Sequence, residues 1–359
     1  MHKILFAVVG FALSAAIFAA PAQIEKPEVH IAVGGKTALY YLPLTITERL
    51  GYFKDEGLTV RISDFAGGTR SLEAVVGGSA DVVSGAYEHT INMQSRKQNF
   101  QAFVLAGAAP QISVAISSKL AGKYKSPKDL KGLKVGVSAP GSSTNMVINY
   151  VLAQGGLKPT DVAIIGVGQG AAVIAAVDQG RVDVVSQTDP AVTMLEKEGK
   201  VKLIAETRTP EGTEKLFGGP MPAASLYAPI EFVKKNPNTV QALTNATVRA
   251  LKWMQEASPQ QILAVVPEEY LLGNKAMYLF AYNNVKTAYS KDGYFSDAGA
   301  KTTLKALASF NTNIKPEAID LKQTYTNEFV KRANVKYPGS SPVASATTQR
   351  SPRDGSKNK

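Results

Sequence analysis

The sequence predicts an α/β fold of two similar lobes, each a mostly parallel sheet flanked by helices, joined by a two-strand hinge. Three observations predict it. Strand-like and helix-like segments alternate along the chain, which is typical of parallel sheets covered by helices. The length of 359 residues exceeds what one hydrophobic core usually supports. Finally, residues 67–89 are similar to residues 169–191, which indicates two units of like construction.

The individual elements follow from local patterns of apolar residues. Short apolar runs rich in β-branched residues predict strands, in chain order, at 29–34, 58–65, 80–86, 104–109, 113–118 and 133–138. Helical spacing of apolar residues, with glycine or proline near an end, predicts helices at 42–51 and 69–76, after Pro237 and near 320–333. The lone Trp253 falls within a helical apolar pattern and is expected to pack in the core.

The internal similarity pairs whole motifs. Gly68 aligns with Gly170, and the stretch Asp81–Ser84 aligns with Asp183–Ser186. Each copy is a glycine-led turn, a short helix, a glycine and then Asp-Val-Val-Ser. Chance, or sequence features common to α/β proteins, could also produce this similarity, but two lobes of similar construction explain it most simply.

The two ends of the chain differ in composition from the body. Residues 1–22 are typical of a cleaved secretory signal, because Lys3 precedes an apolar run that ends in Ala20-Pro21-Ala22; an N-terminal membrane anchor is the alternative. The Ser/Pro-rich residues 338–359 are expected to form a disordered tail. Between them, the first lobe is assigned to residues 23–115 and 225–337, and the second to 116–224. The hinge crossings are expected near 113–118 and 217–227.

Composition excludes several classes of function. The chain has no cysteine, which rules out a thiolate nucleophile, disulfides and a lipid on a cysteine at the cleavage site. With only three histidines, a zinc or other transition-metal site is not expected, and no cofactor motif is present. The net charge is +11, but lysine and arginine are scattered, so we expect no nucleic-acid partner and only a mild preference for anions.

The clearest functional signal is a helix start with hydroxyls and no acid. Ser142, Ser143 and Thr144 precede a long apolar run. Helix starts usually attract acidic residues, because their free N–H groups carry partial positive charge. The hydroxyls and N–H groups could therefore form a neutral donor cradle for an anionic ligand. The alternative is an ordinary serine N-cap. A second start of this kind, Gly67-Gly68-Thr69, favours the cradle.

Candidate binding residues come from a general rule. Doubly wound sheets bind ligands beyond the carboxyl ends of their strands. The candidates follow predicted strands or begin helices, and they are Lys36, Thr37, Tyr41, Gly68, Thr69, Tyr87, Glu88, His89, Ser142, Ser143, Thr144, Thr188 and Asp189.

Among the charged and aromatic candidates, several alternatives stay open. Lys36 and Arg70 could each pair with a carboxylate or sulfonate, but for Arg70 the favoured alternative is that it is solvated or paired with Glu73. Two of Tyr40, Tyr41 and Tyr87 are expected to line the ligand. One histidine beside one glutamate, His89 and Glu88, is too weak a signal for acid–base chemistry, so no catalytic residue is expected.

The motifs resemble a known family. The stretch from Tyr40 to Ile91, with its helix-Gly-Tyr-Phe-Lys turn and Gly67-Gly68 pair, is similar to the start of periplasmic substrate-binding proteins of the nitrate/sulfonate/taurine group of ABC importers. The stretches "SPKDLKGLKVGVSAPGSSTN", "GRVDVVSQTDPA" and "APIEFVKKNP" match the same pattern. The thiamine-pyrimidine synthases resemble this group in fold. The likeness covers residues 29–333 and implies a type II periplasmic binding protein fold.

The resemblance and the residues together give one functional hypothesis. We expect a monomeric periplasmic protein, not an enzyme, that captures a small organic anion between its lobes and delivers it to an inner-membrane permease and its ATPase. Sulfonates and carboxylates, including aromatic acids, are the expected ligands. The alternative is a periplasmic enzyme on the same fold that acts on a small aromatic or pyrimidine substrate.

Overall fold

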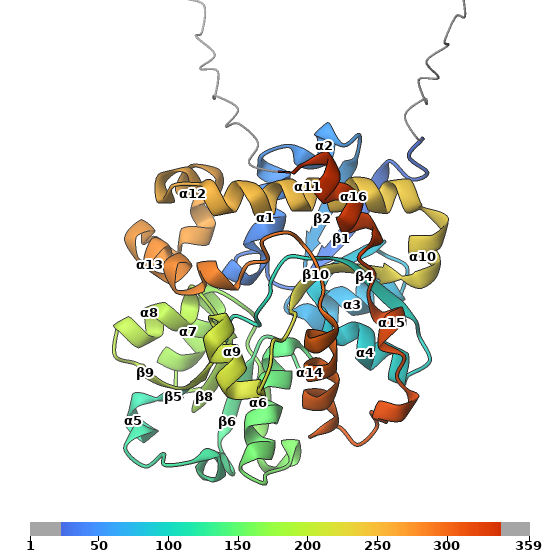
Figure 1. Ribbon diagram of the computed structural model, residues 1–359. Helices are drawn as coiled ribbons and strands as arrows, with labels where there is room; N and C mark the ends of the chain where they lie inside the picture. The colour runs from blue at the N-terminus through green and yellow to red at the C-terminus, as the bar shows by residue number, and fades with distance from the viewer. Residues whose placement is uncertain (1–22, 339–359) are drawn as a thin grey trace, which may run out of the picture.

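The computed structural model describes residues 23–338, which form two sheets covered by helices (Figure 1). The predicted signal segment 1–22 and residues 339–359 of the predicted tail lie outside the described residues. The strands are β1 (Glu28–Val33), β2 (Thr59–Asp64), β3 (Val82–Ala86), β4 (Phe100–Leu105), β5 (Ile112–Ser117), β6 (Lys134–Val137), β7 (Ala163–Gly166), β8 (Val184–Thr188), β9 (Val201–Glu206) and β10 (Ala224–Pro229).

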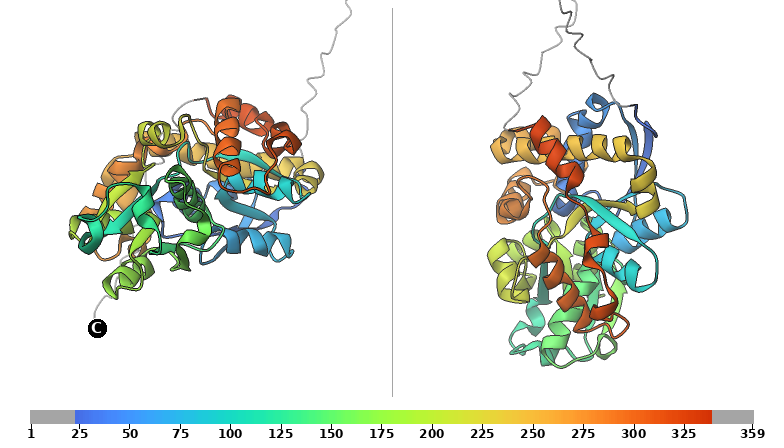
Figure 2. Two further views of the ribbon diagram at one scale, coloured as in Figure 1. Left: turned by 90° about the horizontal axis from the view of Figure 1, so that it is seen from below. Right: turned by 45° about the vertical axis from the view of Figure 1, so that its right-hand side comes forward.

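Helices cover both sheets, and α11 runs across the outer side of the first one (Figures 1 and 2). The α-helices are α1 (Leu42–Arg49), α2 (Tyr52–Asp55), α3 (Gly68–Val76), α4 (Glu88–Ser95), α5 (Ser118–Ala121), α6 (Ser143–Gln154), α7 (Ala171–Asp178), α8 (Ala191–Lys197), α9 (Pro210–Phe217), α10 (Ile230–Lys235), α11 (Pro237–Glu256), α12 (Pro259–Val265), α13 (Lys275–Val285), α14 (Asp297–Ala308), α15 (Leu321–Thr324) and α16 (Glu328–Lys336). Short 3₁₀ turns include η1 (Leu39–Tyr41).

The two sheets share one topology. The first has the strand order β2-β1-β3-β10-β4 and the second the order β7-β6-β8-β5-β9. In each, three strands run parallel and the fourth, β10 or β5, is antiparallel to both its neighbours. The similar sequence segments form equivalent units, α3-β3-α4 and α7-β8-α8. The predicted fold of two mostly parallel lobes is confirmed.

The first hinge crossing lies earlier than the sequence analysis expected. Strand β5 pairs with β8 and β9, so residues 112–117 belong to the second sheet, and the chain crosses at 106–111. The strand expected at 104–109 ends at Leu105. Beyond it the backbone bonds to the other crossing instead, since Gly107 N–H donates to Ala224 O and Ala223 N–H donates to Gly107 O, both at 2.9 Å. Residues 106–109 are small and mostly apolar, as strand residues often are, so the sequence predicted a longer strand although these residues lie in the crossing.

The hydrophobic core is continuous between the lobes. One cluster contains Val83 from the first sheet, Val135 from the second, and Leu304 from α14. Helix α14 packs against both α4 and α6, and so joins the two lobes beside the hinge (Figure 1). Trp253 is partly buried against the core of the first sheet, as expected.

Candidate functional site

A small cavity lies between the two lobes, where the strands of both sheets end. Its volume is about 10 Å³, which is room for about one water molecule. Its walls are hydroxyl, phenol, amide and apolar groups from Tyr40, Tyr41, Gly68, Ile112, Ser138, Ser142, Ser143, Thr144, Gln169 and Thr188. A larger depression of about 290 Å³ lies elsewhere, between α11 and α13. The lobes are therefore closed on each other around the cavity.

The hydroxyl of Ser142 joins the lobes. Ser142 occupies the N-cap position of α6, but its side chain makes no capping bond to that helix. Its Oγ instead accepts a hydrogen bond of 3.1 Å from the N–H of Thr69, in the first turn of α3, and lies 3.2 Å from Thr69 Oγ1. Neither α3 nor α6 has an acidic residue in its first turn. The two hydroxyl-bearing helix starts therefore face each other, and an ordinary N-cap does not explain Ser142.

The neighbouring hydroxyls of α6 are held by the second lobe. Thr144 Oγ1 accepts from the N–H of Ser138 at 2.9 Å, and Ser186 Oγ donates to the Thr144 carbonyl at 2.6 Å. At the end of β8, Thr188 Oγ1 donates to Gln169 Oε1 at 3.0 Å. These bonds fix the hydroxyl wall of the cavity on rigid elements.

Glycines allow the close approach of the two lobes. A Cβ built on Gly67 would lie 2.9 Å from Ala139 Cβ and 3.1 Å from Ala139 N in the second lobe. A Cβ built on Gly35 would lie 2.3 Å from Gln169 Cγ. These distances are shorter than ordinary carbon contacts of about 3.5–4.0 Å, so any larger residue would separate the lobes.

Two tyrosines and two titratable residues extend the site into the first lobe. Burial, and then the Glu88 carboxylate, raise the pKa of both Tyr40 and Tyr41, while the Ser143 hydroxyl opposes this at Tyr40. Glu88 itself is only 2 % exposed. His89 shares a hydrogen bond of 2.7 Å between its Nδ1 and the Tyr227 hydroxyl, and burial lowers the pKa of its imidazole.

Three predicted residues are bonded to partners away from the cavity. Lys36 Nζ pairs with Glu48 Oε2 at 2.5 Å. The hydroxyl of Tyr87 bonds to Thr324 Oγ1 at 2.6 Å, and its fully buried ring packs against Phe295. The partners of Lys36 and Tyr87 lie elsewhere in the chain, so the local sequence does not reveal them.

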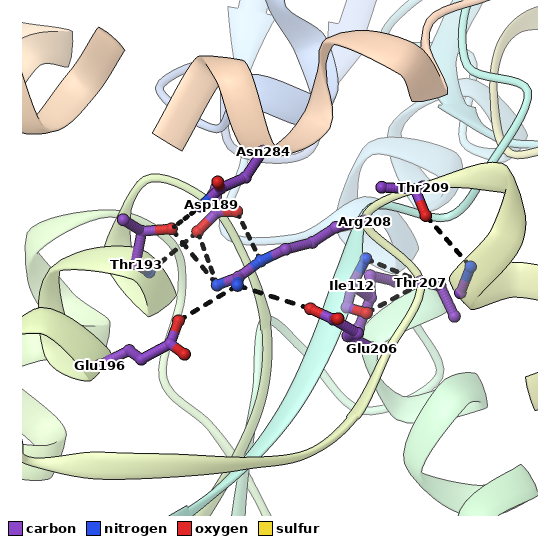
Figure 3. A network of polar contacts seen from close by, with 10 residues as sticks. Ile112, Asp189, Thr193, Glu196, Glu206, Thr207, Arg208, Thr209 and Asn284 are labelled. Carbon is purple, nitrogen blue, oxygen red and sulfur yellow. Dashed lines mark hydrogen bonds and ion pairs between the residues drawn. The ribbon is translucent and has the colours of Figure 1, made fainter. Parts of the chain in front are cut away.

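The third of these residues, Asp189, lies in an ion-pair network (Figure 3). Its Oδ2 is 2.9 Å from Arg208 Nε, and both side chains are almost fully buried. Its backbone carbonyl accepts from the N–H of Leu39 in the first lobe at 2.9 Å. Beside it, Asn284 of α13 donates to Thr193 Oγ1 of α8 at 3.2 Å. Asp189 therefore contributes to lobe contact through its backbone, while its carboxylate is already paired.

The remaining predicted residues lie at or beside the cavity. Tyr41, Gly68, Ser142, Ser143, Thr144 and Thr188 line it, Thr69 bonds to Ser142, and His89 lies against Gly68. Thr37 faces Gly170 of the second lobe, where a Cβ would lie 3.0 Å from its Oγ1. Arg70 pairs with Glu73 at 2.9 Å, as expected. Ile112, the first residue of β5, also lines the cavity and was missed, because an apolar strand residue carries no local binding signal.

Within residues 23–338, no cluster of three or more histidine, aspartate or glutamate side chains is arranged to hold a metal ion. Over the same range, no helix has the length and apolar character needed to cross a bilayer.

Comparisons with known proteins place the chain in a family. A family model described as "NMT1/THI5 like" matches residues 39–262. The chain belongs to the NMT1/THI5-like family. It is 24 % identical over 234 residues to YtlA of Bacillus subtilis (strain 168), which is named as a binding protein; the match covers 65 % of this chain and 68 % of YtlA. It is 26 % identical over 200 residues to the taurine-binding periplasmic protein of Escherichia coli (strain K12), covering 55 % of this chain and 58 % of that protein.

Solved structures agree with this family. A structure from Bordetella bronchiseptica RB50 is 54 % identical, with a TM-score of 0.87, and the match covers 88 % of this chain and all of that one. The alkanesulfonate-binding protein SsuA from Xanthomonas axonopodis pv. citri, solved bound to MOPS, is 18 % identical with a TM-score of 0.65, covering 85 % of this chain and all of that one. The resemblance to the periplasmic binding proteins of ABC importers is confirmed.

Proposed function

We propose that this protein is the solute-binding component of an ABC importer, and that it captures a small organic anion between its two lobes. Relatives named for taurine and alkanesulfonate binding support the class of function. The ligand class is supported by the neutral hydroxyl donors and acid-free helix starts of the cavity. Sulfonates and carboxylates, aromatic acids included, are the proposed ligands.

One observation carries this proposal. The starts of α3 and α6 come from different lobes, and their side chains meet through Thr69 and Ser142 beside the cavity. An anion inserted there would receive N–H and O–H donors from both lobes at once. Because the present cavity holds about one water, the lobes must part before a ligand enters. A bound ligand must hold the lobes somewhat further apart than they are here, and it favours that closed arrangement because only there does it contact both lobes at once.

The remaining parts of the proposal concern location and assembly. We place the protein in the periplasm after removal of residues 1–22, as a monomer that presents its closed form to a permease. The lobes are proposed to divide at the two crossings, so that residues 112–115 move from the first lobe to the second. No nucleic-acid partner or cofactor is included.

A thermal-shift screen tests the function directly. Sulfonates, aromatic carboxylates, taurine, nitrate and pyrimidines are added to the pure protein, because a ligand of the native state raises the melting temperature. At least one organic anion should raise it. The double variant Thr69→Val/Ser142→Ala should lose that shift, whereas Ser79→Ala, in the turn after α3, should keep it. A shift given only by uncharged compounds would contradict the proposal.

The alternative enzyme hypothesis is tested on the same samples. Its acid–base pair would be Glu88 and His89, and the ring of His89 is already bonded to Tyr227. Chromatography of each stabilising compound after long incubation should recover it unchanged. Turnover of any of them would favour the enzyme.

A further inference from the structure

The side chain of Glu88 is a buried acid that the proposed function leaves unexplained. Glu88 is the first residue of α4, directly beyond the carboxyl end of β3. It is 2 % exposed, and its Oε1 has no hydrogen-bond partner within residues 23–338. An isolated carboxylate is unfavourable in such a place unless a donor or a cation compensates it.

The surroundings of Glu88 place it beside the cavity. The ring of the adjacent His89 lies against Gly68, where a Cβ would be 3.2 Å from His89 Cε1, and Gly68 lines the cavity together with Tyr40 and Tyr41. Burial, and then the Glu88 carboxylate, raise the pKa of both phenols. The Tyr40 hydroxyl is buried, also lacks a partner in the described part of the chain, and lies near Ser143 at the start of α6. Glu88 and the start of α6 therefore both act on the Tyr40 phenol.

Within residues 23–338, the lining of the cavity offers Glu88 no cationic partner. The residues that line the cavity include no lysine or arginine. Lys36 is paired with Glu48, Arg70 with Glu73, and Arg208 with Asp189. The adjacent His89 uses Nδ1 with Tyr227, and burial lowers its pKa and so keeps the ring neutral. The site thus combines hydroxyls and the acid-free starts of α3 and α6 with one buried acid, Glu88, whose Oε1 has no hydrogen-bond partner in the described residues.

We propose that Glu88 binds a protonated amino group of the ligand, so that the natural ligand is a zwitterion rather than a simple anion. Its acidic group lies at the starts of α3 and α6, and its ammonium pairs with the Glu88 carboxylate. This inference rests on the proposed function and specifies its ligand class. Charge-assisted hydrogen bonds of this kind are about twice as strong as neutral ones, so Glu88 would act as a specificity residue.

Matched pairs of compounds test the inference by titration calorimetry. One pair is taurine and ethanesulfonate; the other is para-aminomethylbenzoate and para-methylbenzoate. In at least one pair, the amino compound should bind the wild-type protein roughly tenfold or more tightly than its partner. Equal affinity within both pairs, or tighter binding of the compounds without the amino group, overturns the inference and leaves the proposed function standing. If none of the four binds while another organic anion of the thermal-shift screen does, the inference fails and the proposed function stands; if no organic anion binds, both fail.

Two variants assign the preference to one residue. Glu88→Gln keeps the size and removes the charge, and it should abolish the preference while changing the affinity for the compound without the amino group by less than about threefold. Glu73→Gln removes the same charge from the surface of α3 and should keep the preference. Melting curves without ligand verify that both variants are folded. A preference that persists in folded Glu88→Gln overturns the assignment.

Discussion

Replacing Gly67 with alanine should hold the two lobes apart. The added Cβ would lie 2.9 Å from Ala139 Cβ and 3.1 Å from both Ala139 N and the Ser138 carbonyl carbon. Carbon atoms normally pack at about 3.5–4.0 Å, and backbone atoms have no rotamer by which to move away. The lobes must therefore separate by about 0.5–1 Å at this point.

That separation has a calculable effect on closure. The two contacts of Ser142 Oγ with Thr69, at 3.1 and 3.2 Å, would be stretched beyond hydrogen-bonding distance. Losing two neutral hydrogen bonds of about 0.5–1.5 kcal/mol each disfavours the closed form by about 1–3 kcal/mol. A ligand held by donors of both lobes would have its own hydrogen bonds stretched by the same separation, so its Kd should rise by a comparable factor, roughly 5- to 150-fold.

The assay must separate closure from backbone strain. Gly67 has a φ of 106°, where any L-residue is strained, so the control must also place an alanine at a positive φ. Gly78 has a φ of 76° and no atom within 4 Å of its would-be Cβ, so Gly78→Ala is the control. The two variants are compared by ligand titration, and by small-angle scattering without ligand. If Gly67→Ala binds as tightly and is as compact as Gly78→Ala, the reasoning is refuted.

Three further predictions concern individual side chains. Arg208→Met leaves the buried Asp189 carboxylate unpaired and should lower the free energy of unfolding in urea by about 3–5 kcal/mol; a loss below about 0.5 kcal/mol would contradict it. Burial lowers the pKa of His89, so below about pH 6.5 the unfolded chain binds a proton that the folded protein does not. The free energy of unfolding should therefore fall from pH 7 to pH 5 in the wild-type protein, and it should fall less in His89→Gln. Urea denaturation of both proteins at each pH measures the difference. Tyr87→Phe loses the hydrogen bond to Thr324, so it should lower the free energy of unfolding by about 1 kcal/mol and leave the ligand affinity unchanged. A weaker affinity in this variant would show that Tyr87 contributes to ligand binding.

The arrangement of the cavity was largely predictable from the sequence, because it follows from sheet geometry. Strands that run parallel end at one edge, so the residues after them must gather there. This placed Gly68 and Thr69 in one lobe, and Ser142 to Thr144 in the other, at positions that the structure brings together. The internal similarity added the expectation that the two edges are built alike. Neither argument needed knowledge of contacts between distant residues.

Partners distant in the chain were not predictable. The Tyr87 hydroxyl bonds to Thr324, 237 residues later, and no local pattern reveals that pairing. Asp189 occupies a suitable strand end, but Arg208, 19 residues on, takes its carboxylate. A residue type shows what a side chain can bind, whereas the rest of the fold decides whether it is still free to do so.

The absence of acid from the start of α6 is consistent with the proposed chemistry. An aspartate in place of Ser142 would be a good N-cap, but its charge would neutralise the helix end and repel an anion. A serine leaves the helix end positive, and its hydroxyl can instead accept the Thr69 N–H of the opposite helix while the lobes are closed. The acid near the cavity is Glu88, in the first turn of α4 of the first lobe rather than at the start of α3 or α6. Separating the acid from the two positive helix ends gives the cavity a dipole that matches a zwitterion, and an aspartate at position 142 would destroy that dipole.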